Sequence, residues 1–237
     1  MQLTTSPEKL SSILESAMLP SHSKALINPI ILTSTEDQIS TQGTYSDIIA
    51  YSHTFSKAFF EEYIPGEETP IPSPVLDTLR TSFKDEKVTL NCKTKLTLKD
   101  KREKYERDLE TIPEKSFPIQ FKKTDQGYTD SRIEPTTSFL VNIAELNLPP
   151  ADKYTFTFAK NKLSVEVEKE GGKLTRKIPL KDVFKDTDIS ISVDATYFAL
   201  LTKNLSNDVY MVLNENLISL SETAEDYTKA YLLSVLT

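Results

Sequence analysis

The sequence is poor in several residue types that mark particular classes of protein. Its 237 residues include no tryptophan, one cysteine, two histidines and five glycines. The lone Cys92 cannot form an intrachain disulfide or a thiolate zinc site by itself, so we interpret it as an ordinary strand residue. The scarcity of glycine leaves no glycine-rich phosphate loop, and we expect no cofactor.

Long apolar runs are also missing. No run approaches the roughly 18 apolar residues needed to cross a bilayer. Residues 1–5 lack the basic and then apolar pattern of a signal peptide. We therefore expect a soluble intracellular protein, in the cytoplasm or nucleoid of a prokaryote or its virus, or in the nucleus if the host is eukaryotic.

Positive charge is in deficit, because the formal net charge is −7. This argues against a protein that coats nucleic acid over most of its surface, although it leaves room for a locally basic face. With 38% hydrophobic and 27% charged residues, the chain is long enough for two domains of roughly 100 to 120 residues, each with its own core.

The residues that usually carry catalysis or bind metal form no pattern. His22 and His53 stand apart, and neither the cysteine nor any serine lies in a nucleophile-elbow context. The acidic pairs at 61–62 and 67–68 read as a solvated loop, because they lack the histidine spacing of a zinc site and the aspartates of a calcium loop. We predict no active site, no metal centre and no enzymatic activity.

What the sequence does contain is a unit that occurs twice, an amphipathic helix followed by a β-hairpin, at 76–98 and 198–220. An offset of 122 residues (198 − 76) superposes the helix positions, and an offset of 121 (209 − 88) superposes the first hairpin strand. The paired residues are Leu76 with Phe198, Leu79 with Leu201, Phe83 with Leu205, Val88 with Val209, and Leu90 with Met211. A period of half the chain indicates two copies of one fold rather than a solenoid.

An earlier helix is expected in each half. Ser6 is a candidate N-cap with Pro7 at the first helical position, and apolar residues follow at helical spacing. The second half offers Phe139, Ile143 and Leu146 at an offset of 129 (139 − 10) from Leu10, Leu14 and Ala17. The four predicted helices, 7–18, 74–84, 135–148 and 194–205, together carry a net charge of −1.

The sequence between these helices is typical of strands. The ten tyrosines and eleven phenylalanines favour a fold rich in β-sheet. We expect strands at 30–32 and 39–41 around a turn near Asp37, with Gly43 as a break before 48–51. Alternating apolar residues predict a hairpin over 154–167, with its turn at Asn161 and Lys162. Gly171 and Gly172 then lead into a strand near 174–180, which gives an α+β fold.

The segment 113–127 is predicted to connect the two copies, so the division is 1–112, 113–127 and 128–237. It holds two prolines and an apolar cluster of Phe117, Ile119 and Phe121. Two interpretations are open. The cluster belongs to an edge strand that finishes the first domain, or its side chains stay available to a partner.

This order of elements resembles the proliferating-cell nuclear antigen (PCNA) type of DNA sliding clamp, over essentially the whole chain. LNCKTKLTLKDKREKYERDLETIP (90–113) is similar to the last strands of that family's first domain, with KYERDLE as the interface strand. YTDSRIEPTTSFLVNIAEL (128–146) is similar to the strand and helix that open its second domain. EDYTKAYLLSVLT (225–237) is similar to its closing strand and tail.

The resemblance implies two clamp domains that assemble as a homotrimer, a six-domain toroidal ring with the helices lining its hole. Such a ring would encircle duplex DNA as a processivity factor in replication and repair, tether DNA polymerase and other clamp-binding proteins, and could need a clamp loader. The implied subunit interface comprises Tyr105, Arg107, Leu109, Leu174, Arg176 and Ile178. The residues implied to face DNA are Lys9, Arg80, Lys84 and Lys203.

The family's partner peptides dock apolar anchors between the connector and the C-terminal strand, and hydrogen-bond to the tail backbone. The matching residues here are Ile48, Ile49, Phe117, Ile119, Leu217, Tyr231, Leu232 and Leu233. Ile48, Leu217 and Leu232 can also be ordinary core residues. The near-neutral helices depart from a clamp's basic channel. An alternative stays open: a clamp-fold accessory subunit that forms no homotrimer, either monomeric or one member of a heterotrimer.

Overall fold

The computed structural model describes residues 1–17, 30–45, 48–72, 74–109, 121–124, 127–130 and 135–236. The chain divides into two compact units. The first unit comprises 1–43, 53–116 and 224–228, and the second comprises 44–52, 117–223 and 229–237. Strands β4 (Ile49–Ser56) and β20 (Tyr227–Ser234) contribute residues to both. The domain ranges 1–112 and 128–237 stay predictions.

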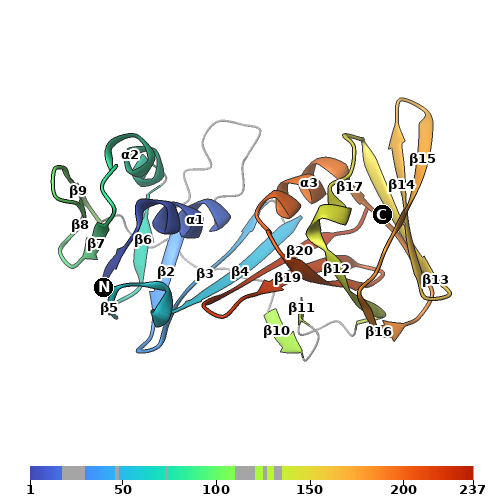
Figure 1. The fold of residues 1–237 in the computed structure, drawn as a ribbon, viewed down its shortest axis with the longest axis horizontal. Helices are drawn as coiled ribbons and strands as arrows, with labels where there is room; N and C mark the ends of the chain where they lie inside the picture. The colour runs from blue at the N-terminus through green and yellow to red at the C-terminus, as the bar shows by residue number, and fades with distance from the viewer. Residues whose placement is uncertain are drawn as a thin grey trace. The chain divides into compact units, whose positions relative to one another are not determined.

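Two helices of the first unit pack side by side, α1 (Pro7–Ala17) and α2 (Pro74–Ser82) (Figure 1). Helix α1 begins as the sequence predicts, because the Lys9 amide donates to Ser6 Oγ at 3.3 Å, as an N-cap serine allows. The predicted apolar stripe of α1 is buried. Arg80 of α2 and Glu15 of α1 form an ion pair of 2.7 Å.

The first unit carries an antiparallel sheet in the order β5-β1-β7-β8-β9. Its strands are β1 (Gln2–Thr5), β5 (Glu62–Ile64), β7 (Val88–Cys92), β8 (Lys95–Lys99) and β9 (Lys104–Asp108). Strand β2 (Ile30–Ser34) pairs with both β3 (Gln38–Tyr45) and β6 (Thr69–Ile71). Gly43 lies inside β3, so the predicted break at this glycine is wrong.

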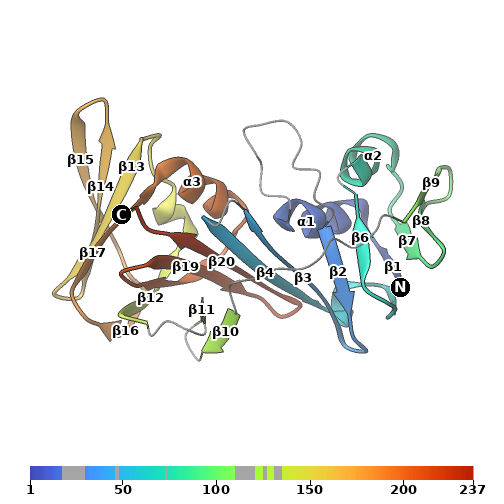
Figure 2. The same ribbon diagram turned by 180° about the vertical axis from the view of Figure 1, so that it is seen from behind.

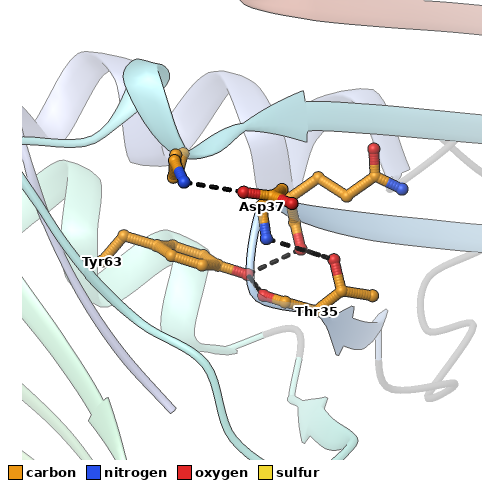
Figure 3. Close-up of polar contacts among 5 residues, drawn as sticks. Thr35, Asp37 and Tyr63 are labelled. Carbon is orange, nitrogen blue, oxygen red and sulfur yellow. Dashed lines mark hydrogen bonds and ion pairs between the residues drawn. The ribbon is translucent and has the colours of Figure 1, made fainter.

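The predicted turn near Asp37 joins β2 to β3, and the side chain of Tyr63 of β5 hydrogen-bonds to this turn (Figure 3). The Tyr63 hydroxyl lies 2.6 Å from each of two backbone carbonyl oxygens, those of Thr35 and Gln38. Desolvation raises the pKa of the Tyr63 hydroxyl, although hydrogen bonds to Ser34 and Thr35 oppose the shift. Asp37 also pairs with Lys57 at 2.7 Å, and Lys57 is the first residue of the 3₁₀ turn Lys57–Phe59.

The second unit contains a four-stranded antiparallel sheet in the order β15-β14-β13-β17. Its strands are β13 (Lys153–Ala159), β14 (Lys162–Lys169), β15 (Gly172–Ile178) and β17 (Ile189–Asp194). Both hairpins use two-residue turns with positive φ, at Lys160 and Asn161 (52° and 57°) and at Glu170 and Gly171 (49° and 79°). The first turn therefore comes one residue earlier than predicted.

A second set of strands in this unit follows the order β16-β12-β18-β19-β20. They are β12 (Thr137–Asn142), β16 (Asp182–Asp186), β18 (Asp208–Leu213) and β19 (Leu217–Thr223). A small hairpin of β10 (Phe121–Thr124) and β11 (Gly127–Asp130) lies against β18 and β19, and Figures 1 and 2 show it beside β19.

The predicted repeat of helix and hairpin is confirmed. Helix α2 runs into β7 and β8, and α3 (Ala195–Lys203) runs into β18 and β19. All ten residues that the offsets of 122 and 121 pair are buried. Phe198 anchors α3 on the sheet beneath it, because its ring lies 4.9 Å from that of Phe156 and 5.8 Å from that of Tyr154.

The helix predicted over 135–148 is wrong. Strand β12 occupies most of this segment, and one 3₁₀ turn, Ile143–Leu146, follows it. Phe139 lies inside the sheet and stacks on Phe158, with ring centroids 5.6 Å apart. Asn142 caps the short turn, and prolines at 149–150 follow at once; a residue before proline is biased away from helix. The apolar spacing of this segment fits both a helix and a strand, and strand pairing together with the prolines selects the strand.

Candidate partner-binding site and sheet edges

Three side chains of the second unit form an apolar cluster. They are Ala50 of β4, Leu217 of β19 and Leu232 of β20, all buried. Phe121, at the start of the β10–β11 hairpin, packs against them and is only partly buried. We call the first three residues the apolar cluster. Residues of the predicted connector, of β4, of β19 and of the C-terminal strand thus meet at one place.

The structure brings Leu217 and Leu232 together and separates other predicted site residues from them. Ile49, Tyr231 and Leu233 are buried at positions next to Ala50 or Leu232, and successive side chains of a strand point to opposite faces. Tyr231 reaches the end of α3, where its hydroxyl interacts with Asn204; burial is the main cause that raises its pKa.

The remaining predicted residues of this site divide into two kinds. Ile48 is half-buried, and its carbonyl oxygen accepts a hydrogen bond from the Ser234 amide at 2.8 Å. Phe117 and Ile119 lie outside the described residues. The residues predicted for this site did not include Ala50. Phe121 was predicted only as one of the apolar residues of the connector. The alternation of β4 selects Ile49, Tyr51, His53 and Phe55 for one face, so it offered no signal for Ala50.

The C-terminal tail is fixed by its own backbone. Three successive amides, those of Ser234, Val235 and Leu236, donate to the carbonyl oxygens of Ile48, Asn216 and Ser192. The distances are 2.8, 3.1 and 2.8 Å, in that order. A peptide that approaches the tail therefore finds these three donors already used.

The two strands predicted to join neighbouring subunits both lie at sheet edges. Within the described part of the chain, β9 pairs only with β8, and β15 pairs only with β14. A strand at an edge presents unpaired backbone groups that a further strand can complete. These are the geometric requirements of an association through strand pairing.

The predicted edge residues of β9 lie on the core-facing side of its sheet. Tyr105 and Arg107 stand opposite Leu98 and Leu96, which are buried, and Tyr105 is itself half-buried. Leu109 follows the strand and is also half-buried. The edge is therefore partly apolar on this side.

Strand β15 has the same arrangement. Leu174, Arg176 and Ile178 stand opposite the buried residues Val167, Val165 and Leu163. Ile178 is buried and Arg176 pairs with Glu145 at 2.9 Å, but Leu174 keeps 55% of its surface exposed. Burying an exposed leucine is favourable, so Leu174 leaves apolar surface exposed beside this edge.

Comparison with known proteins gives a fold. No protein-family model and no curated protein matches the sequence. Among solved structures, the A. fulgidus PCNA bound to the C-terminal region of FEN-1 is 13% identical with a TM-score of 0.76, covering 100% of this chain and 98% of that one. PCNA from Entamoeba histolytica is 13% identical with a TM-score of 0.77 and the same coverage. A chain of the Sulfolobus tokodaii PCNA2–PCNA3 complex is 16% identical with a TM-score of 0.72, and the match covers 99% of both chains.

The chain has the PCNA fold. The predicted α+β architecture and the resemblance to that fold are confirmed over the full length. At 12–16% identity the likeness concerns the backbone, so each side chain has to be judged in this protein.

On this PCNA fold, the helix cations predicted to face DNA are mostly engaged. Lys9 Nζ lies 4.8 Å from the centre of the Phe59 ring, and Arg80 pairs with Glu15. Lys84 donates to the Arg80 carbonyl. Lys203 is exposed and has no polar partner among the residues that the structure describes. A cation already paired contributes less to attraction of phosphate.

Those residues weighed as an enzyme or metal site that the structure describes form no constellation in this PCNA-fold chain. His53 is buried in β4, and His22 lies outside the described residues. The carboxylates of Glu61, Glu62 and Glu68 contact Lys87, Thr4 and Thr33, respectively. Among the described residues no group of histidine, cysteine and acidic side chains could hold a metal ion, and no helix is both long and apolar enough to cross a membrane.

Proposed function

We propose that the chain is a subunit of a DNA sliding clamp, a non-enzymatic processivity factor. Its assembled ring encircles duplex DNA and tethers DNA polymerase and other replication and repair proteins. The observation that supports this best is the PCNA fold over the whole chain, with the two predicted contact strands at sheet edges. Fold likeness alone does not establish function, which is why assembly has to be measured.

The proposed ring is a homotrimer in which β9 of one copy pairs with β15 of the next. Such a contact is heterologous, and it closes a ring when its rotation is complete after three copies. Leu174 would be covered by the neighbour, and Tyr105 would extend the apolar contact. The exposed pairs Lys104–Glu106 and Lys173–Glu166 would set register, because surface ion pairs contribute only about 0 to 1 kcal/mol each.

The test is the solution mass of the purified chain by light scattering over a concentration series. We expect a species near three times 26.8 kDa. A trimer should then increase the product length of a DNA polymerase on circular templates. A monomer at every concentration would contradict the homotrimer.

A second candidate is one member of a heterotrimeric clamp. The Sulfolobus tokodaii neighbour is a complex of two different PCNA subunits, which favours this alternative. In that case the isolated chain would stay monomeric, and mixing it with its partner subunits would give the larger mass.

The proposed partner site is the surface around the apolar cluster, where an apolar anchor of a clamp-binding peptide would bind. It lies between a strand of the connector and the C-terminal strand, which both take part in forming it. The probe that we propose is a synthetic peptide of the FEN-1 C-terminal region, which binds A. fulgidus PCNA. Measurable binding to this chain would support the site.

A further inference from the structure

The partner site is already occupied by the chain itself. Phe121 packs on Ala50, Leu217 and Leu232, and those three residues expose little surface. An incoming apolar side chain would therefore meet the Phe121 ring at this place rather than the three residues of the apolar cluster. Either the anchor binds elsewhere or Phe121 moves.

The hairpin that carries Phe121 has few constraints of its own. Within the described residues, β10 and β11 form a sheet of two strands and pair with no other strand. An isolated two-stranded hairpin is marginally stable in water, so its position depends on its contacts with the sheet beneath it. Phe121 is such a contact, and its ring is only partly buried.

The backbone beside the cluster is closed in the same way. The amides of Ser234, Val235 and Leu236 donate within the chain, and the acceptor of Ser234 lies two residues before Ala50. Both kinds of contact that a peptide could make here, apolar burial and hydrogen bonding to tail amides, are thus made internally. In the free chain, residues of the chain itself therefore make the apolar contact and the backbone hydrogen bonds of this site.

We propose that Phe121 is a displaceable cover of the partner site. The apolar anchor of a partner peptide takes the place of the Phe121 ring on the apolar cluster, and the β10–β11 hairpin lifts away. This inference rests on the proposed function, because it assigns the regulation of the same site. The exchange replaces one apolar contact by another, so its net free energy is small and the partner's remaining contacts decide affinity.

The first experiment uses Phe121→Trp as a reporter, because the chain contains no tryptophan. On addition of the FEN-1 C-terminal peptide we expect the emission to shift to the red, as the indole moves into water. The matched control is Phe184→Trp, a half-buried aromatic of the same unit that contacts Tyr210 at 5.6 Å. Its spectrum should not change. A blue shift at position 121 would place the residue in the peptide's own contact surface and overturn the cover.

The second experiment measures affinity for the same peptide. Removing the ring removes the competitor, so Phe121→Ala should bind roughly tenfold more tightly than the parent, given the apolar area of one aromatic side chain. Binding that is tenfold weaker would show that the peptide needs Phe121, and unchanged binding would show that the ring does not compete. Either result overturns the proposal.

A third measurement separates the cover from the proposed function. Hydrogen exchange of the full chain without peptide should show the amides of β10 and β11 exchanging at least about tenfold faster than those of β19, because the hairpin opens locally. Equal protection would overturn the cover whatever the peptide does. If neither the parent nor Phe121→Ala binds the peptide, the proposed partner site fails. If binding occurs and the emission of the Phe121→Trp variant stays constant, only the cover fails.

Discussion

One carboxylate supplies the hydrogen bonds that the first turn of α3 would otherwise lack. Asp194 Oδ1 accepts from the amides of Thr196 at 2.8 Å and Tyr197 at 3.1 Å. Loss of such a cap costs about 1 kcal/mol. We expect Asp194→Ala to lower the free energy of unfolding by this amount in urea denaturation. Asp186→Ala, an exposed aspartate on β16, is the control and should leave stability unchanged.

A buried carboxylate holds the loop after α3. Glu222 is fully buried and accepts from the Ser206 amide and hydroxyl at 3.0 Å each, and from the Asn207 side chain. Glu222→Gln places an amide nitrogen against these donors, so we expect a loss of about 1 to 3 kcal/mol in the free energy of unfolding. The control Glu225→Gln changes an exposed side chain. Equal stability of the two variants in urea would contradict this assignment.

The single thiol gives a pH dependence. Burial raises the pKa of Cys92 from 9.0 to about 12, although the positive N-terminus opposes the shift. As pH rises, the unfolded chain therefore loses this proton first, and stability falls between about pH 9 and pH 12. Relative to Cys92→Ala, the parent should lose about 1 to 2 kcal/mol between roughly pH 8 and pH 10. Parallel denaturation curves at both pH values would contradict the burial of this thiol.

At the scale of elements, the β2–β3 turn depends on a hydroxyl from another strand. Tyr63 bonds to two carbonyl oxygens of this turn (Figure 3). Tyr63→Phe leaves both without that donor, and we expect about 1 kcal/mol less stability and faster exchange of the Thr35 amide, measured by denaturation and hydrogen exchange. Tyr210→Phe is the control, because no hydrogen bond of the Tyr210 hydroxyl occurs among the described residues. Equal exchange rates at Thr35 in both variants would exclude this role.

The two halves of the repeat also differ at the level of elements. In the part of the chain that the structure describes, the first half places two α-helices side by side, whereas the second half has α3 and the 3₁₀ turn at 143–146. A clamp built from this chain would therefore line its hole with fewer helices than the sequence predicts. Few free cations remain on those helices, so enclosure rather than phosphate binding would keep the ring on DNA.

At the scale of the whole molecule, the exposed Leu174 provides the sharpest test of assembly. In the proposed ring its side chain is buried by a neighbour, so Leu174→Glu should convert the trimer to monomer at low micromolar concentration while the fold stays intact. Ile64→Glu is the matched control, because Ile64 is 54% exposed on β5, the opposite edge of the first unit's sheet. Light scattering and circular dichroism measure both properties.

A trimer that survives Leu174→Glu would exclude β15 as the contact strand. Loss of assembly in both variants would point to a general effect of added charge. Tyr105→Ala tests the same contact from the side of β9. This variant should weaken the ring, because it removes an aromatic side chain at a small interface.

The sequence by itself determined the duplication. Apolar positions at offsets of 122 and 121 fixed the helix and hairpin of both halves, because each copy needs the same buried face. The resemblance to the PCNA family pointed to β9 and β15 as the contact strands, and the strand pairing places both at sheet edges. The sequence could not settle 135–148, where the apolar spacing fits a helix or a strand and only pairing with β16 and β18 selects the strand.

Only the tertiary structure decided the site. Leu217 and Leu232 come together with Ala50, whereas Tyr231 and Leu233 are buried away from them, because neighbouring residues of a strand face opposite sides. Only the packing shows that Phe121 covers the cluster and that the tail amides are already bonded. The hydrophobic pattern of the sequence indicates which residues are buried. Which neighbours bury it depends on strands far apart in the chain, and the fold alone brings these together.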